Sequence, residues 1–112
     1  SRGASTKATH TVGTWKRNDF GWWYVLSDGS YPVNTWMIIN NQWYFFDNVG
    51  YMRTGWELWN DKWYYMNEEG QMQTGWVFVN EHWYYLSEDG ACLMSTMTPD
   101  GYYVDENGAW VE

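Results

Sequence analysis

The stretch WELWNDKWYYMNEEGQMQTGW (residues 56–76) decides how this chain folds. It is dense in tryptophan and tyrosine, yet it contains no long apolar run. It also begins and ends on the same step, because Gly55 precedes Trp56 and Gly75 precedes Trp76. A segment that returns to its own first residues after a fixed interval indicates a repeat, so the period is the first property to establish.

The period is 20 residues over most of the chain. Three columns keep it: Trp36, Trp56 and Trp76; Trp43, Trp63 and Trp83; Gly50, Gly70 and Gly90. Trp15 and Trp22 keep the seven-residue interval between paired tryptophans, and one extra residue falls before Trp36, beside Pro32. Near the end, GYYVDENG (101–108) matches WYYLSEDG (83–90), with Gly101 in place of tryptophan. The predicted units are 15–35, 36–55, 56–75, 76–96 and a degenerate 97–112.

Each unit has the pattern of a β-hairpin. WELW and WYYM are short, rich in aromatic residues and separated by NDK, while NEEG and SEDG form further turns that end on glycine. Asn40, Asn60 and Asn80 share the hairpin-turn position, where asparagine tolerates a left-handed backbone. Alternation places Trp63 and Tyr65 on one face. The opposite face, with Tyr44, Tyr64 and Tyr84, is assigned to packing.

A single hairpin is marginally stable, but stacked hairpins can cover one another's rings. We therefore expect an all-β solenoid of about five stacked hairpins, with almost no helix and with the last unit as a terminal cap.

Composition limits the classes of partner. Aromatic residues make up 22% of the 112 residues and the formal net charge is -8. An acidic surface argues against nucleic acid and favours a cationic or neutral ligand, unless the charge serves only solubility.

Cys92 is the only cysteine, so no intrachain disulfide is possible. No apolar run approaches the length of a membrane span. Residues 1–13 are small and polar, as in a linker, which suggests the C-terminal piece of a longer or processed protein.

The repeats resemble the choline-binding, or cell-wall-binding, repeat family. TGWELWNDKWYYMNEEGQMQTGW (54–76) and TGWVFVNEHWYYLSEDG (74–90) carry the resemblance. Less perfect copies are NTWMIINNQWYFFDNVGYMRTGW (34–56) and GTWKRNDFGWWYVLSDGSY (13–31). The family occurs in surface proteins, autolysins and phage lysins of Gram-positive bacteria. Membership would imply a secreted, non-catalytic module that anchors its parent to choline or phosphocholine groups of teichoic-acid-type polymers in the cell wall.

The resemblance also implies choline sites made of two tryptophans from one hairpin and a third ring from the next, often with a methionine. Mapped onto this chain, the expected sets are Trp36 and Trp43 with Tyr65 and Met72; Trp56 and Trp63 with Tyr85, where Cys92 replaces the methionine; Trp76 and Trp83 with Tyr103; and Trp15 and Trp22 with Phe45 and Met52. The family further implies possible dimerisation through the C-terminal hairpin. Met72 and Cys92 are also interpretable as packing residues between hairpins.

Aromatic cages suit a quaternary ammonium because it has no N–H group to donate. Ring faces attract it by cation–π interaction, at roughly 0.5 to 2 kcal/mol per ring. After association costs, a three-ring site has about millimolar affinity, and several sites on one polymer gain from avidity.

Other functions remain open at this point. A glucan-binding module would also stack rings on its ligand, although such repeats lack the regular tryptophan pair, and a structural or dimerising rod would use the rings for packing alone. The histidines, His10 in the linker and His82 in a turn, have no catalytic partner motif. The acidic turns lack the ligand spacing of a metal site. We predict no catalytic residue, cofactor or metal.

Overall fold

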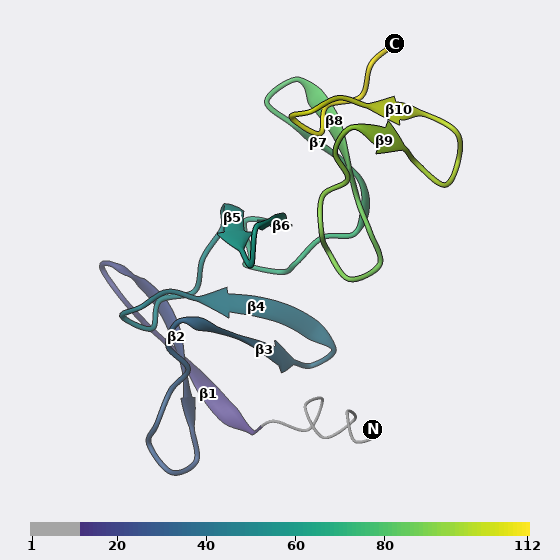
Figure 1. The fold of residues 1–112 in the computed structure, drawn as a ribbon. Coiled ribbons are helices and arrows are strands. Elements are labelled where there is room, and N and C mark those ends of the chain that lie inside the picture. Colours follow the sequence, from purple (N-terminus) through teal and green to yellow (C-terminus); the bar gives the residue numbers. More distant parts are fainter. Residues whose placement is uncertain (1–11) are drawn as a thin grey trace. The chain divides into compact units, whose positions relative to one another are not determined.

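The computed structural model describes residues 12–112, and within them the chain is all-β, without a helix. Ten strands form five antiparallel pairs (Figure 1). The pairs are β1 (Gly13–Asn18) with β2 (Gly21–Leu26), β3 (Thr35–Ile39) with β4 (Gln42–Phe46), β5 (Gly55–Trp59) with β6 (Lys62–Met66), β7 (Gly75–Val79) with β8 (His82–Leu86), and β9 (Thr96–Met97) with β10 (Tyr103–Val104). The predicted all-β fold of five hairpins is confirmed. Most of the predicted linker, including His10, lies outside the described residues.

The chain divides into two compact units. Among the described residues, the N-terminal unit comprises 12–54 and Glu68–Met72, and the C-terminal unit comprises Gly55–Asn67 and Gln73–Glu112. Within each unit, the segment that follows one hairpin donates a backbone hydrogen bond to the preceding hairpin in the chain. Met52 N, for example, donates a 2.7 Å hydrogen bond to Trp22 O in the N-terminal unit, and Cys92 N donates a 2.8 Å bond to Trp63 O in the C-terminal unit. These bonds join neighbouring repeats, as expected for hairpins that are too small to stand alone.

The hairpin turns at three of the repeats have two residues, both with a left-handed backbone. Asn60 has φ 51° and Asp61 has φ 65°, and β5 and β6 pair directly on either side of them. The same geometry recurs at Asn40 and Asn80. Two successive positive φ angles define the type I′ turn, whose twist matches that of the flanking strands. The sequence prediction of left-handed asparagines at these positions is confirmed.

A second left-handed position precedes each of three tryptophans. Gly55 and Gly75 supply it with φ values of 82° and 75°. Before Trp36, where Thr35 replaces glycine, Asn34 takes the left-handed conformation one residue earlier, with φ 50°. Asparagine tolerates this region better than a β-branched threonine, so the imperfect repeat still delivers its tryptophan to the start of a strand.

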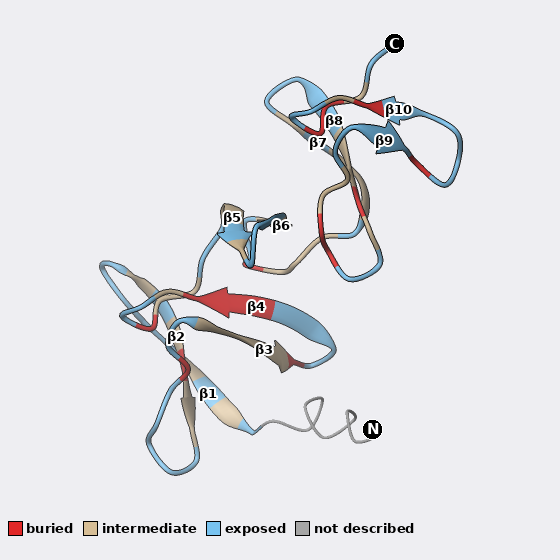
Figure 2. Ribbon diagram, in the orientation of Figure 1, coloured by how far each residue is buried: buried red, intermediate tan, exposed pale blue. Residues whose placement is uncertain are grey.

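The most deeply buried side chains are spread along the chain, one in each hairpin from the second to the fifth. Phe46, Met66, Leu86 and Val104 are almost wholly buried, and each lies at or next to the end of a second strand. In the N-terminal unit, Tyr24, Ile39 and Tyr44 join Phe46 in a cluster, so that β4 is buried over its second half (Figure 2). Apart from Phe45, which is also buried, the remaining aromatic residues are only partly covered or exposed, and many keep a face available to a ligand.

Candidate functional site: aromatic pockets of the C-terminal unit

One pocket of about 380 Å³, here called the middle pocket, combines residues from two successive hairpins. Trp56 lies on β5, Trp63 on β6 and Tyr84 on β8. The rings of Trp56 and Tyr84 have centroids 4.9 Å apart and meet edge to face at 72°. Trp63 remains 38% exposed, so a ligand can reach its ring. The rest of the wall is formed by Cys92, Met94, Glu106 and Asn107.

The third ring of this pocket is Tyr84, whereas the sequence prediction placed Tyr85 there and assigned Tyr84 to packing. Tyr85 lies opposite Trp76 in its own hairpin, with centroids 5.2 Å apart. Because side chains alternate along a strand, the preceding residue, Tyr84, points the other way and contacts Trp56 of the hairpin before. Alternation was thus the signal that could have identified Tyr84 from sequence.

Cys92 lines the middle pocket together with Trp56 and Trp63. Its backbone N–H binds Trp63 O, which fixes the residue against β6. Burial raises the pKa of its thiol to about 11, so the side chain is neutral at physiological pH. It contributes a small, apolar wall in place of a reactive thiolate.

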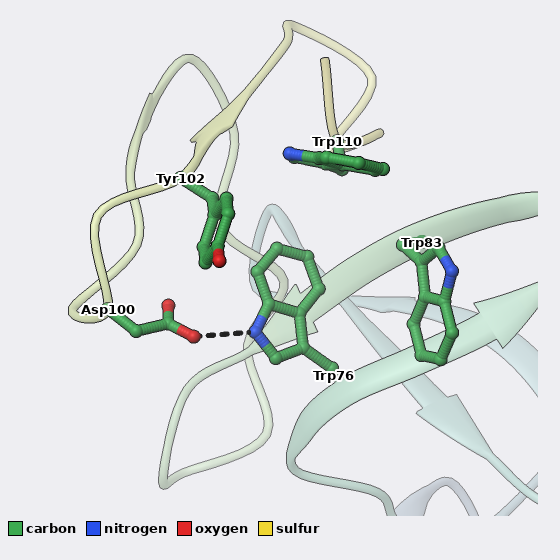
Figure 3. A pocket seen from close by; sticks show the side chains of 5 residues that line it. All are labelled: Trp76, Trp83, Asp100, Tyr102 and Trp110. Carbon is green, nitrogen blue, oxygen red and sulfur yellow. Dashed lines mark hydrogen bonds between the residues drawn. The ribbon is translucent and has the colours of Figure 1, made fainter. Parts of the chain in front are cut away.

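A second pocket of about 430 Å³, the C-terminal pocket, lies between the fourth and fifth hairpins (Figure 3). Trp76 meets Trp83 at 6.5 Å and 83°, and meets Tyr102 at 5.9 Å and 81°. Trp110 is the fourth aromatic ring that lines this pocket, and its centroid lies 6.2 Å from that of Tyr102. The indole Nε1–H of Trp76 donates a 2.9 Å hydrogen bond to Asp100 Oδ2, which places a carboxylate at the pocket.

The prediction for this site named Trp76 and Trp83, and the structure brings them together, but with Tyr102 instead of Tyr103. Tyr103 lies opposite Met97 in the short fifth hairpin and does not line the pocket. The reason is the same strand alternation that selects Tyr84. Trp110 and Asp100 were not predicted. Trp110 stands two residues after Gly108, as Cys92 stands two after Gly90, so the repeat itself could have located it.

In the N-terminal unit the structure brings Trp15 and Trp22 together at 6.4 Å and places Tyr44 against Trp15 at 5.0 Å. Met52 packs on the same cluster. Phe45, the predicted third ring, instead contacts Trp36 at 5.1 Å. The guanidinium of Arg17 stands 5.4 Å from the Trp22 ring centroid. An internal cation therefore already uses one of the rings on which this predicted choline site depends.

The predicted set around Trp36 and Trp43 is distributed over both units. Trp36, Trp43 and Met72 belong to the N-terminal unit, where Met72 N donates a 2.9 Å bond to Trp43 O. Tyr65 belongs to the C-terminal unit, where it pairs with Trp56 at 5.0 Å. The assignment of these four residues to one site stays a prediction.

The carboxylates of the turns have structural partners. Asp47 Oδ1 accepts backbone hydrogen bonds from Val49, Gly50 and Tyr51 at 2.8 to 2.9 Å. Burial opposes ionisation of this group, but these bonds, with the charge of Arg53, hold its pKa below the usual value. Asp100 also has a lowered pKa, because Thr98 and then Trp76 donate side-chain hydrogen bonds to it. Both carboxylates are ionised at neutral pH.

Within residues 12–112, no group of three or more histidine, cysteine or acidic side chains is arranged to hold a metal ion. The same residues include no helix of the length and apolarity that a membrane crossing requires. What the pockets offer chemically is ring faces and carboxylates, a combination that attracts organic cations.

Comparisons with known proteins agree with this chemistry. The sequence model described as the choline-binding repeat matches residues 33–68 and 54–96. A search of curated protein sequences finds no significant match.

Solved structures give further matches. Choline-binding protein F of Streptococcus pneumoniae, crystallised in the presence of a peptidoglycan analogue, is 39% identical, with a TM-score of 0.83 over 90% of this chain and 34% of that protein. The phage Cp-1 endolysin, solved with choline, is 35% identical, with a TM-score of 0.72 over 91% of this chain and 38% of that one. The choline-binding domain of Spr1274 from S. pneumoniae is 40% identical, with a TM-score of 0.67 over 72% of this chain and 98% of that domain. The chain thus spans about a third of the length of the first two.

Proposed function

This chain belongs to the choline-binding repeat family, and from that membership we propose that it is a non-catalytic module that anchors its parent protein to the bacterial cell surface. In this proposal, choline groups of cell-wall polymers sit in the aromatic pockets of the C-terminal unit. The observation that carries it is the middle pocket, in which Trp56, Trp63 and Tyr84 converge from two hairpins.

The geometry of this pocket suits a trimethylammonium group. Three rings line a space of about 380 Å³, and Cys92 and Met94 add apolar contacts for the methyl groups. Each ring contributes about 0.5 to 2 kcal/mol of cation–π attraction, and the total falls to a few kcal/mol after association costs. We therefore expect millimolar affinity for free choline.

The distribution of charge supports a cationic ligand. Residues 55–112 hold eleven of the fourteen acidic residues and a single basic residue, Lys62. An excess of negative charge around ring-lined pockets raises the local concentration of cations. Weak sites of this kind become useful when several engage one polymer with many choline groups, because each later contact is intramolecular. The relatives named above include a pneumococcal choline-binding protein and a phage endolysin, which supports a role at the cell surface.

The test is a choline titration followed by intrinsic tryptophan fluorescence. We expect a saturable response with half-saturation near millimolar choline, reduced in Trp63→Ala or Trp83→Ala and lost in the double variant. Trp59→Ala is the matched control, since Trp59 lines neither pocket. Sodium chloride at equal ionic strength and glucose oligomers are the ligand controls. A response to the glucose oligomers without one to choline would move the assignment to carbohydrate binding. No fluorescence response to either ligand would mean that the rings serve packing alone.

A further inference from the structure

The two pockets of the C-terminal unit differ in one wall. The same backbone hydrogen bond recurs four times, each time from an N–H group that follows one hairpin to a carbonyl in the second strand of the hairpin before it. The donor and acceptor pairs are Met52 to Trp22, Met72 to Trp43, Cys92 to Trp63 and Trp110 to Trp83, all at 2.7 to 2.9 Å. Trp110 therefore occupies the column that elsewhere holds methionine or cysteine. The C-terminal pocket has four aromatic rings where the middle pocket has three.

The pockets also differ in how their carboxylate is held. Asp100 lies in the turn between β9 and β10, where Thr98 Oγ1 donates a 2.6 Å bond to its Oδ1 and Trp76 donates to its Oδ2. Thr98 is itself 4% exposed and accepts a 3.0 Å bond from Tyr102 N, so the turn is well ordered around the acid. The acid of the middle pocket, Glu106, is an exposed turn residue. A fixed charge loses less entropy when it meets a ligand than a mobile one does.

The trimethylammonium group of choline has no N–H to donate, so Asp100 acts on that group through charge. That action has two parts. The carboxylate attracts the ammonium directly across the Trp76 ring, and by accepting the indole N–H bond it makes that ring a better partner for a cation. Solvent exposure keeps both contributions modest and sensitive to salt.

Resting on the proposed choline-binding function, we propose that Asp100 and Trp110 make the C-terminal pocket the tighter and more charge-selective of the two choline sites in the C-terminal unit. Trp110 supplies a fourth ring surface, which strengthens binding of any ligand of this shape. Asp100 supplies the preference for a positive charge over a neutral group of the same shape.

Two substitutions separate these roles. Asp100→Asn removes the charge but keeps an oxygen that can accept the Trp76 N–H bond, so the pocket keeps its shape. Trp110→Met installs the residue that the same column carries at Met52 and Met72. Glu106→Gln is the matched control, because it removes one negative charge at the middle pocket. Circular dichroism establishes that each variant is folded.

The ligands are choline and 3,3-dimethylbutan-1-ol, which has carbon in place of the charged nitrogen. Indole N–H signals in ¹H–¹⁵N NMR report each pocket separately, Trp76 and Trp110 for the C-terminal pocket and Trp56 and Trp63 for the middle one. We expect choline to half-saturate the C-terminal pocket at a concentration several-fold lower than the middle pocket. Asp100→Asn should weaken choline there by about three- to tenfold and leave the alcohol unchanged. Trp110→Met should weaken both ligands there.

Three results would overturn the proposal: tighter choline binding at the middle pocket, an unchanged choline affinity in Asp100→Asn, or an equal loss for choline and the neutral alcohol. The last result would mean that Asp100 only positions Trp76. Choline binding in the middle pocket alongside any of these results leaves the proposed function standing. Absence of choline binding at both pockets rejects the proposed function and this inference together.

Discussion

Tyr84 shows how a one-residue difference assigns a side chain to a site. It contacts Trp56 of the preceding hairpin, while its neighbour Tyr85 pairs with Trp76 inside its own hairpin. Burial and a nearby Cys92 and Asp105 raise the pKa of Tyr84, so its ring stays neutral and electron-rich in the physiological range. The same alternation selects Tyr102 over Tyr103 in the C-terminal pocket.

This assignment predicts different effects for two adjacent tyrosines. Tyr84→Leu keeps much of the side-chain volume but removes the ring, so we expect choline binding in the middle pocket to weaken about tenfold or more, in line with the loss of a cation–π partner. Tyr85→Leu should leave that pocket within about twofold of the parent. The Trp63 indole signal during a choline titration measures both. Loss of middle-pocket binding in Tyr85→Leu, with Tyr84→Leu unaffected, would contradict the placement seen here.

At the scale of the element, the hairpin turn sets the pairing register of the two strands. The register decides which side chains lie on each face of the hairpin. Asn60 and Asp61 are both left-handed, and this directs Leu58 opposite Trp63 and Trp56 opposite Tyr65. A slip of one residue would exchange the two faces of β6 and remove Trp63 from the middle pocket. Turn chemistry and ligand geometry are therefore linked in each repeat.

Substitution at the turn tests this link. Asn60→Ala places a residue with a Cβ and no compensating side-chain polarity in the left-handed region, so we expect the free energy of unfolding to fall by about 1 kcal/mol. Asn60→Gly is the control, because glycine adopts positive φ without steric cost, and it should be near neutral. Urea denaturation followed by tryptophan fluorescence measures both variants. Equal stability of the alanine and glycine variants would show that the left-handed turn is not limiting.

At the scale of the whole molecule, small cores and partly exposed rings make ligand binding a part of stability. Each hairpin from the second to the fifth contributes one fully buried side chain, such as Met66 or Leu86, while tryptophans such as Trp63 and Trp83 remain about 40% exposed. A ligand in the pockets covers apolar ring surface that the hairpins alone leave exposed to water. Choline should therefore stabilise the folded state as well as bind to it.

We expect the unfolding midpoint in urea to rise with choline concentration. At ten times the dissociation constant, linkage predicts about 1.4 kcal/mol of added stability per occupied pocket. Trp63→Ala should remove the contribution of the middle pocket and keep that of the C-terminal pocket. Equal concentrations of sodium chloride control for ionic strength. A midpoint independent of choline, or a shift reproduced by the salt, would disagree with linked binding.

The sequence by itself determined the features that depend on neighbours along the chain. The 20-residue period, the hairpins, the left-handed Asn40, Asn60 and Asn80, and the tryptophan pairs all follow from local spacing and backbone preference, which act within a few residues. The family resemblance then gave the ligand class, and the membership established here agrees with it.

Tertiary structure decided which rings share a pocket, because that depends on the face each strand presents to the next hairpin. Tyr84 and Tyr102 took the places predicted for Tyr85 and Tyr103. Asn34 compensated for Thr35. The shortened fifth hairpin lost its own tryptophan pair, with Met97 and Gly101 in those columns, yet it delivered Asp100 and Trp110 to the C-terminal pocket. The physical reason is that a contact between hairpins is fixed by packing and by hydrogen bonds between residues far apart in the chain, such as that from Trp110 to Trp83. A local pattern gives the faces of one strand, and packing decides which face meets the next hairpin.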